Sequence, residues 1–509
     1  MKKILIVGSG INGLVAANYL VKNGFEVSII EKKSYSGGAC IKDTVEIEGK
    51  KIDYAYGPTV LGMMPDFIFN ETGLSRNTHA YYPKNPKIVY FNKGSDSAKI
   101  FQDSKKLQDE LKSKWGENGA VNDFRNDENK VINFIQNIYK NAISPSIYHA
   151  NSELGEDLTR LWITGSAKDL LDHYFESERT KLYMGMTVIE SGPASIYEEG
   201  TAFTIPLMDS GSVFNGYWGF VKTGIWKITE NLTKINRDLG VKFYFNTEIN
   251  EVDSDNNFIC FSQDKIHHKF NYDNLIFATD PITPSKLILN FKNGKDLDLV
   301  GTSGKVTAFF KNPVIWKESN SFSDSFRFIF SVDTIEKLDT ASQNALNNTN
   351  DYFPGFIQVY PEGSAQRNMN NKEEFDKLIF FTKNLSYNKD SNNLKDLKDK
   401  IISTVLPYIE NTEDLVFSKF LAPKDLNEVF LFPKGNIDHT TLTGSQNYNK
   451  RTFSHNKNNF YNFYDYENIY YCGAGSFPCG SVAGTPGYMC SKQLMRKIRE
   501  HKNKSASIL

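Results

Sequence analysis

The stretch that decides the fold reads Ile4-Leu5-Ile6-Val7-Gly8-Ser9-Gly10-Ile11-Asn12-Gly13, an apolar run followed by three spaced glycines. A helix-like stretch follows over residues 14–22, and a second apolar run, Val27-Ser28-Ile29-Ile30, comes after it. A strand, a glycine turn, a helix and a second strand are the parts of a dinucleotide-binding βαβ unit. The sequence therefore predicts a Rossmann-like domain that begins with this first strand.

Each glycine of the loop has a separate physical role. Gly8 allows a tight turn off the strand, Gly10 allows the backbone to approach a diphosphate, and Gly13 allows the helix to pack closely on the strand. The N-terminus of the helix offers free N–H groups and the positive end of a dipole to the phosphates. A lone glycine pattern could be an ordinary loop, but its place between a strand and a helix favours cofactor binding.

The residues after the second strand favour FAD over NAD. Glu31 lies 18 residues after Gly13, where a carboxylate can accept hydrogen bonds from ribose hydroxyls and disfavours a 2′-phosphate. Gly37 and Gly38 follow at a short interval, so the chain continues past the dinucleotide with a second glycine pair. Alone, that pair could be a simple loop. Taken together with the βαβ unit that precedes it, the pair resembles the signature of FAD-dependent amine oxidases, phytoene desaturases and their relatives.

The composition predicts a globular protein of more than one domain. A chain of 509 residues is longer than the chain that one ordinary hydrophobic core can serve. The 59 basic and 60 acidic residues give a net charge of -1, so no overall field draws in nucleic acid or an anionic membrane. The 37 phenylalanines and 26 tyrosines mainly predict core packing, although a share could line a substrate cavity.

The cysteines and the apolar runs bear on the cellular compartment. The five cysteines are Cys40, Cys260, Cys472, Cys479 and Cys490. They are scattered and contain no C-x-x-C pair, so they predict buried thiols and no disulfide framework, zinc site or redox pair. No signal peptide and no apolar run of membrane-spanning length is visible. We expect a cytoplasmic enzyme without a metal site, and peripheral membrane contact stays open.

Hydrophobic periodicity divides the rest of the chain into five segments. Residues 1–75, 214–285 and 455–509 are predicted to form an FAD-binding domain, residues 76–213 a mostly helical cap, and residues 286–454 the second part of a substrate domain. Helices are expected over residues 101–115, 127–143, 154–175, 394–409 and 485–501. Strands are expected near residues 45–48, 51–54, 240–245, 246–252, 258–270, 275–278, 306–310, 326–332, 356–360 and 468–472. The predicted class is α/β, with a Rossmann-like FAD-binding domain assembled from separated segments and an α+β substrate domain under a helical cap.

The C-terminal segment carries a more specific resemblance. Residues 472–484 read Cys-Gly-Ala-Gly-Ser-Phe-Pro-Cys-Gly-Ser-Val-Ala-Gly and are similar to the closing flavin motif of the phytoene desaturase-like family. Residues 166–171, 218–224, 423–428 and 435–439 resemble one branch of it in the same order, the branch called pyridine nucleotide-disulfide oxidoreductase domain-containing protein 2. The resemblance spans nearly the whole chain.

The resemblance implies a set of cofactor contacts. Gly8, Gly10 and Gly13 would face the diphosphate, and Glu31 would face the adenosine ribose. The backbone of Ile249 would meet the adenine, unless this is an ordinary strand residue. The glycine turn at residues 473–475 would approach the ribityl chain and the isoalloxazine. The predicted cofactor-binding residues are Gly8, Gly10, Ile11, Asn12, Gly13, Glu31, Lys32, Gly37, Gly38, Ile249, Gly473, Gly475 and Val482.

The sequence departs from the family pattern at two positions of the closing motif. Phe477 stands where a histidine is common, and Cys479 where a further glycine is usual. A bulkier pair beside the flavin would reshape the pocket and puts the family's substrates in doubt. Cys479 could attach to the flavin or react with it, but a packed thiol is the more ordinary interpretation.

The implied function is that of an FAD-dependent oxidoreductase, which transfers a hydride from an apolar or amphipathic small molecule to flavin N5. No triad, metal cluster or carboxylate pair stands out, so the catalytic residues are not identified. His439 is the one histidine singled out, although a lone histidine is usually structural. Arg451 and Gln446 could bind a polar substrate group, with surface roles favoured. A flavin amine oxidase and a non-catalytic flavin-binding interaction protein are the alternatives, and the substrate, electron acceptor and subunit number stay open.

Overall fold

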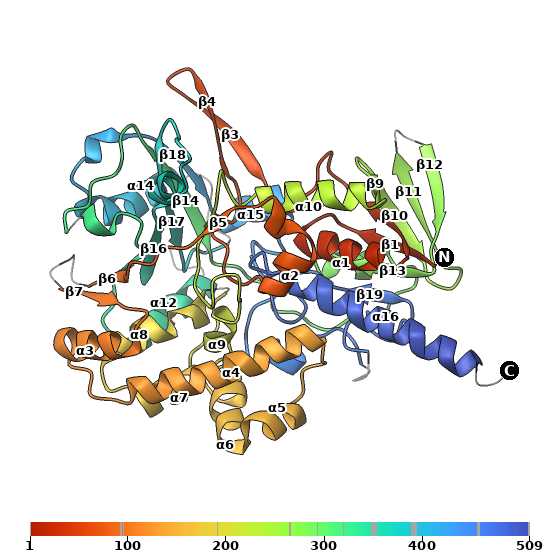
Figure 1. Cartoon of the computed structure of the whole chain (residues 1–509), viewed down its shortest axis with the longest axis horizontal. Helices are drawn as coiled ribbons and strands as arrows, with labels where there is room; N and C mark the ends of the chain where they lie inside the picture. Colours follow the sequence, from red (N-terminus) through yellow and green to blue (C-terminus); the bar gives the residue numbers. More distant parts are fainter. Residues whose placement is uncertain are drawn as a thin grey trace.

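The computed structural model describes residues 2–506 except 92, 93, 95, 191, 264, 265, 293, 319, 348–353, 388–393 and 456–458. Its first layer is a parallel sheet of five strands that come from three distant parts of the chain (Figure 1). In spatial order the strands are β19 (Ile469–Tyr471), β13 (Asn274–Phe277), β1 (Lys3–Val7), β2 (Glu26–Ile30) and β9 (Lys242–Tyr244). One row of paired residues crosses the whole sheet, in the order Tyr470, Ile276, Ile6, Ile29, Phe243.

Three helices pack together beside this sheet: α1 (Ile11–Lys22), α10 (Lys227–Asp238) and α16 (Thr485–Ala506). Residues 12–20 of α1 are all buried because both other helices lie against it. Asn236 joins α10 to α1, since its Nδ2 donates to the carbonyl oxygen of Leu14 at 2.8 Å. A Cβ atom on Gly487 would lie 2.0 Å from the carbonyl oxygen of Asn12, so α16 approaches the start of α1 backbone to backbone. The two ends of the chain therefore fold together.

The second layer is a sheet of seven strands on the other side of the molecule (Figure 1). In spatial order they are β18 (Leu415–Leu421), β14 (Gly304–Phe310), β17 (Asp376–Thr382), β16 (Phe356–Tyr360), β15 (Arg327–Phe330), β6 (Lys87–Phe91) and β7 (Asp96–Ile100). The strands β6, β7, β17 and β18 were not among the predicted ones. The first two lie inside the segment predicted to be a helical cap, where they pair with each other, and β6 also pairs in parallel with the distant β15.

The helices of the cap gather at one end of the molecule, and both chain termini lie toward the opposite end (Figure 1). They are α3 (Ser104–Trp115), α4 (Val121–Asn141), α5 (Ile147–Leu154), α6 (Glu156–Leu158), α7 (Ala167–Tyr174), α8 (Glu178–Gly185) and α9 (Thr204–Met208). The helix expected over residues 154–175 is broken, because Gly155 has φ +83° and the hydroxyl of Ser166 accepts a hydrogen bond from the N–H of Asp169 to start α7. The largest apolar core joins the cap to α1 through buried residues such as Leu14, Trp162 and Phe203.

Smaller elements complete the fold. The strands are β3 (Lys42–Ile47) paired with β4 (Lys50–Ala55), β5 (Ala80–Tyr81) paired with β8 (Phe220–Val221), and the sheet β10 (Glu248–Asp253), β11 (Phe258–Gln263), β12 (Ile266–Asn271). The remaining helices are α2 (Asp66–Glu71), α11 (Ile282–Leu287), α12 (Ile335–Leu346), α13 (Glu362–Asn368), α14 (Leu394–Val405) and α15 (Pro423–Phe430). No helix in the described ranges is long and apolar enough to cross a membrane. The predicted fold class is confirmed, and the five segment boundaries remain predictions.

Arg451 holds together two loops, residues 438–446 and residues 474–476. Arg451 is 2% exposed, and within the described residues its guanidinium donates to backbone carbonyl groups alone, at distances from 2.9 to 3.5 Å. The accepting residues are Asp438, Thr440, Thr441, Gln446, Ala474 and Ser476. Gln446 is also buried, and its Nε2 donates to the carbonyl oxygen of Asp298 at 3.0 Å. The surface roles expected for both residues are therefore wrong, because backbone carbonyls in the interior take up their donors.

We predict that Arg451→Lys lowers the free energy of unfolding by about 2–4 kcal/mol, since a lysine cannot reproduce the planar fork and leaves buried carbonyls without donors. Urea unfolding of the apoprotein measures the effect. Arg160→Lys is the matched control, because the Arg160 side chain is 81% exposed. Equal stability of the two variants would contradict the role assigned to Arg451.

Candidate functional site

A cavity of about 510 Å³ lies at the carboxyl ends of the parallel strands, where α/β sheets place their ligand sites. Val7 and Gly8 line it at the end of β1, Glu31 after β2, and Ala278 after β13. The cavity continues to the seven-stranded sheet, where Lys305 of β14 is part of its wall. It therefore joins the two layers of the molecule.

The glycine loop forms one wall of the cavity. Gly8 has φ +97° and donates its N–H to the carbonyl oxygen of Ile30 at 2.9 Å, which turns the chain off β1. Gly10, Ile11 and Asn12 line the cavity at the start of α1. Gly13 lies behind this wall, where a Cβ atom would be 2.2 Å from the carbonyl oxygen of Gly8. Gly13 therefore serves helix–strand packing, and its expected approach to a diphosphate remains a prediction.

The second glycine pair lies against the first loop. Gly37 and Gly38 have φ values of +128° and +62°, and both line the cavity. The N–H of Gly37 donates to the carbonyl oxygen of Ser9 at 2.9 Å. A Cβ atom on Gly38 would lie 3.1 Å from the Cα of Gly10. Two stretches of bare backbone thus meet here and leave room for a ligand to approach both.

The carboxylate of Glu31 is held in place at the end of β2. Its Oε2 accepts hydrogen bonds from the N–H and the hydroxyl of Ser9, at 2.9 and 2.6 Å, and its Oε1 accepts from the N–H of Lys33 at 2.9 Å. Lys32 lines the cavity too, but its Nζ pairs with Glu248 at 2.6 Å on the exposed side. Ile249 of β10 lines the same part of the cavity beyond Glu31.

The C-terminal loop forms the wall beside β13. Ala474, Gly480, Ser481 and Val482 line the cavity, and Ser481 and Val482 have φ values of +55° and +58°. Gly473 and Gly475 do not themselves line the cavity, whereas Ala474 between them does, so their expected approach to the flavin half of FAD remains a prediction. A Cβ atom on Gly473 would be 2.0 Å from the carbonyl oxygen of Thr279, and one on Gly475 would be 3.0 Å from the hydroxyl of Tyr471. Both glycines therefore allow the loop to pack on the strands behind it.

The two residues that depart from the family pattern lie in the core. Phe477 is fully buried in an aromatic cluster with Phe203, Tyr448 and Phe460. Cys479 is fully buried as well, and burial raises the pKa of its thiol well above the ordinary value. The expected bulky pair in the pocket is therefore wrong, and the interpretation of Cys479 as a packed thiol fits its position.

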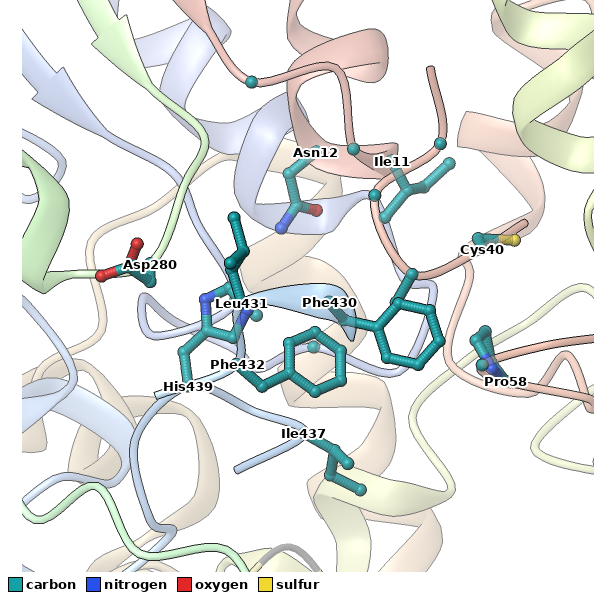
Figure 2. A pocket seen from close by; sticks show the side chains of 18 of the residues that line it. Ile11, Asn12, Cys40, Pro58, Asp280, Phe430, Leu431, Phe432, Ile437 and His439 are labelled. Carbon is teal, nitrogen blue, oxygen red and sulfur yellow. The ribbon is translucent and has the colours of Figure 1, made fainter. Parts of the chain in front are cut away.

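Two further walls of the cavity were not predicted, apart from His439, which was the one histidine singled out in the sequence. Phe430, Leu431, Phe432, Ile437 and His439 line the cavity opposite the glycine loop (Figure 2). The other wall belongs to the seven-stranded sheet and the segments packed on it, through Glu190, Trp218, Lys305, Tyr360, Ile379 and Phe381. A lysine directly before the apolar run of β14 is the one sequence signal that could have pointed to this second wall.

Comparison with known proteins agrees with this geometry. The family described as NAD(P)-binding Rossmann-like domain matches residues 6–66. Two 4,4'-diapophytoene desaturases of Staphylococcus aureus match over 268 residues, at 27% identity in strain COL and 28% in strain Newman. The match covers 49% of this chain and 49% of each relative, so the chain spans about half the length of the curated relatives it matches.

Two solved structures share the fold over almost the whole chain. Putrescine oxidase bound to putrescine has a TM-score of 0.61 at 14% identity, covering 98% of this chain and 99% of that one. Cyclohexylamine oxidase from Brevibacterium oxydans has a TM-score of 0.59 at 14% identity, covering 99% of both chains. Together, these findings confirm the predicted resemblance to the phytoene desaturase-like oxidoreductases, in a chain whose fold is shared with amine oxidases.

Proposed function

We propose that the cavity holds FAD and that the protein uses it to oxidise a small apolar or amphipathic molecule. The observation that carries this proposal is the single cavity that joins the glycine loop of β1 to the seven-stranded sheet. Bound there, FAD would supply two-electron redox chemistry that protein side chains lack. The similarity to diapophytoene desaturases supports this reaction class over half of the chain.

The residues at the glycine-loop end fit the adenosine diphosphate half of FAD. The bare backbone at Gly10 and Gly38 leaves space for a diphosphate, and the N-terminus of α1 offers its N–H groups and dipole. The fixed carboxylate of Glu31 can accept hydrogen bonds from ribose hydroxyls. Ile249 of β10 lines the cavity, which supports a contact with the adenine. We propose these residues as the cofactor-binding set, together with the other predicted residues that line the cavity.

The opposite end of the cavity fits an apolar substrate. Trp218, Tyr360, Ile379 and Phe381 supply aromatic and aliphatic surface there. Such surface binds apolar groups by removing them from water, and it positions them without hydrogen bonds. These side chains therefore support a substrate with a large apolar part.

Burial shifts the pKa of two ionisable groups at this end of the cavity. The Nζ of Lys305 donates to the carbonyl oxygens of Ala55 and Gly57, at 2.5 and 2.8 Å, and burial lowers its pKa to about 7. Burial raises the pKa of Glu190, while the nearby Lys383 acts in the opposite direction. A buried lysine and a buried carboxyl group in one cavity could exchange protons with a substrate.

An amine substrate is the second candidate. Glu190 brings a carboxyl group to a wall that also contains aromatic side chains, which is suited to a cationic amine. The fold shared with putrescine oxidase and cyclohexylamine oxidase supports it too. A protein that holds FAD without turnover is the third candidate.

We also propose a cytoplasmic location and no nucleic-acid partner. The five cysteines are free thiols, which is typical of a reducing compartment. The net charge of -1 gives no attraction to nucleic acid.

Replacing Gly10 tests the cofactor site. Gly10 has φ -68°, which any residue adopts, and the nearest atom to an added Cβ is 3.9 Å away, so a valine fits the fold but projects into the cavity. We predict that Gly10→Val weakens FAD binding at least ~100-fold, measured by titrating the apoprotein. A stable Gly10→Val protein that still purifies yellow would show that the site is misplaced.

The control for this variant is Gly13→Ala. Because its Cβ would meet the Gly8 carbonyl oxygen at 2.2 Å, we expect this change to lower the free energy of unfolding by about 1–3 kcal/mol. Gly10→Val should leave the stability of the apoprotein nearly unchanged in the same urea titration.

Anaerobic mixing of the FAD-loaded protein with three compounds tests the reaction class. We expect the apolar polyene diapophytoene to bleach the flavin, because the wall at Ile379 and Phe381 offers apolar contacts. Putrescine and cyclohexylamine should leave the flavin oxidised. Bleaching by the amines alone would select the amine candidate, and a flavin that stays oxidised with all three would favour the protein without turnover.

The stability of the apoprotein should depend on pH through Lys305. Its pKa is about 7 in the folded chain and about 10.4 in the unfolded chain. Between these values the unfolded state binds more protons, so Lys305 makes stability rise with pH by up to about 1.4 kcal/mol per pH unit. Lys305→Met should remove this part of the slope between about pH 7 and pH 9 in urea titrations. Parallel curves for the two proteins would mean that Lys305 titrates normally.

A further inference from the structure

Residues 429–439, here called the strap, close the cavity on the side opposite the glycine loop. The strap begins at the end of α15, the helix that comes directly after β18 in the sequence. It nevertheless reaches the loop after β2. The Nζ of Lys33 donates to the carbonyl oxygen of Val429 at 2.7 Å. The ring of Phe430 packs against Tyr56 at 5.3 Å between centroids. The strap is therefore tied to the cofactor layer, although the sequence assigns it to the substrate domain.

His439 is held firmly at the end of the strap. Its ring packs against Phe432 at 5.3 Å between centroids, and its backbone has φ +64°. The preceding residue, Asp438, is fixed from two sides: its Oδ1 accepts from the N–H of Gly480 at 2.8 Å, and its carbonyl oxygen accepts from Arg451 at 2.9 Å. A non-glycine residue in the left-handed region is strained, and such strain often marks a functional position.

One ring nitrogen of His439 has no partner in the protein. The ring lies beside the backbone of Thr279, which follows β13. Its Nδ1 is buried and has no hydrogen-bond partner among the residues that the structure describes. The carboxylate of the nearby Asp280 accepts instead from the N–H groups of Ile282 and Thr283, at 2.9 and 3.0 Å. Figure 2 shows the His439 side chain on the same side of the cavity as Asp280 and Leu431.

The surroundings of the ring decide what Nδ1 can bind. Burial lowers the pKa of His439 below its ordinary value, which favours the neutral imidazole. A neutral imidazole has one N–H donor and one acceptor, and a hydroxyl group can pair with either nitrogen because it both donates and accepts. A buried nitrogen without a partner in the protein therefore suits a hydroxyl group of a ligand.

We propose that Nδ1 of His439 forms a hydrogen bond with a ribityl hydroxyl of FAD. This inference rests on the proposed FAD site. Hydroxyl groups are the donors that FAD carries between its diphosphate and its ring system. The adenosine ribose has its own acceptor in Glu31, which lies after β2, whereas His439 lies beside β13 and Gly480 of the C-terminal loop. The strap thereby supplies one side chain to the flavin half of the cofactor.

The test compares FAD with ADP as ligands of the apoprotein. ADP has the adenosine ribose and the diphosphate but no ribityl chain. His439→Gly removes the ring at a backbone position that suits glycine, and we expect it to weaken FAD binding about 10-fold while the ADP affinity stays unchanged. His439→Asn is the rescue variant, because asparagine tolerates a positive φ and offers an oxygen acceptor near the position of Nδ1. It should recover most of the FAD affinity.

Each outcome separates the two proposals. If His439→Gly weakens the binding of FAD and of ADP equally, the ribityl contact is overturned. The same holds if the His439→Gly protein binds FAD as tightly as the unchanged protein does. Unchanged apoprotein that binds ADP but not FAD would overturn the proposed function itself. Urea unfolding of all three apoproteins shows whether a loss of binding reflects a loss of stability, and His439→Asn then carries the comparison if His439→Gly is unstable.

Discussion

The structure depends on close contact between backbones at three glycines around the start of α1. Gly13 lies on the carbonyl oxygen of Gly8, Gly487 lies on that of Asn12, and Gly38 lies on the Cα of Gly10. A side chain at either of the first two positions would overlap a carbonyl oxygen, so the helix would have to move away from its neighbours. These contacts bring strands and helices from the two ends of the chain together, and they leave the loop surface free of side chains.

The cavity forms where the two layers of the chain face each other, and each layer contributes part of its wall. The parallel sheet supplies rigid backbone at the glycine loops, whereas the seven-stranded sheet and the segments beside it supply side chains such as Phe381 and Trp218. Arg451 connects the two contributions, because its guanidinium holds the loop at Asp438 and the loop at Ala474 together. The position of His439 is a consequence of this arrangement. The two layers therefore contribute different kinds of surface to one cavity.

The accuracy of sequence reasoning differed from residue to residue for physical reasons. Glu31 was found because its distance from the glycine loop is set by one helix and one strand. The turn at Gly473 predicts a close approach, but the sequence cannot tell whether a ligand or another backbone approaches the glycine itself. Here it is the carbonyl oxygen of Thr279. Arg451 was expected at the surface because charged residues usually lie there, and six backbone carbonyl groups override that preference.

The sequence by itself determined the βαβ unit, the class of the fold and the residues of the glycine loops. Those features depend on contacts between near neighbours, which spacing and residue type encode directly. Only the tertiary structure decided that β6 joins a sheet with β15, that the strap reaches the glycine loop, and that Glu190, Lys305 and His439 line one cavity. These residues are separated by long stretches of chain, and their meeting depends on the packing of whole layers, which no local pattern records.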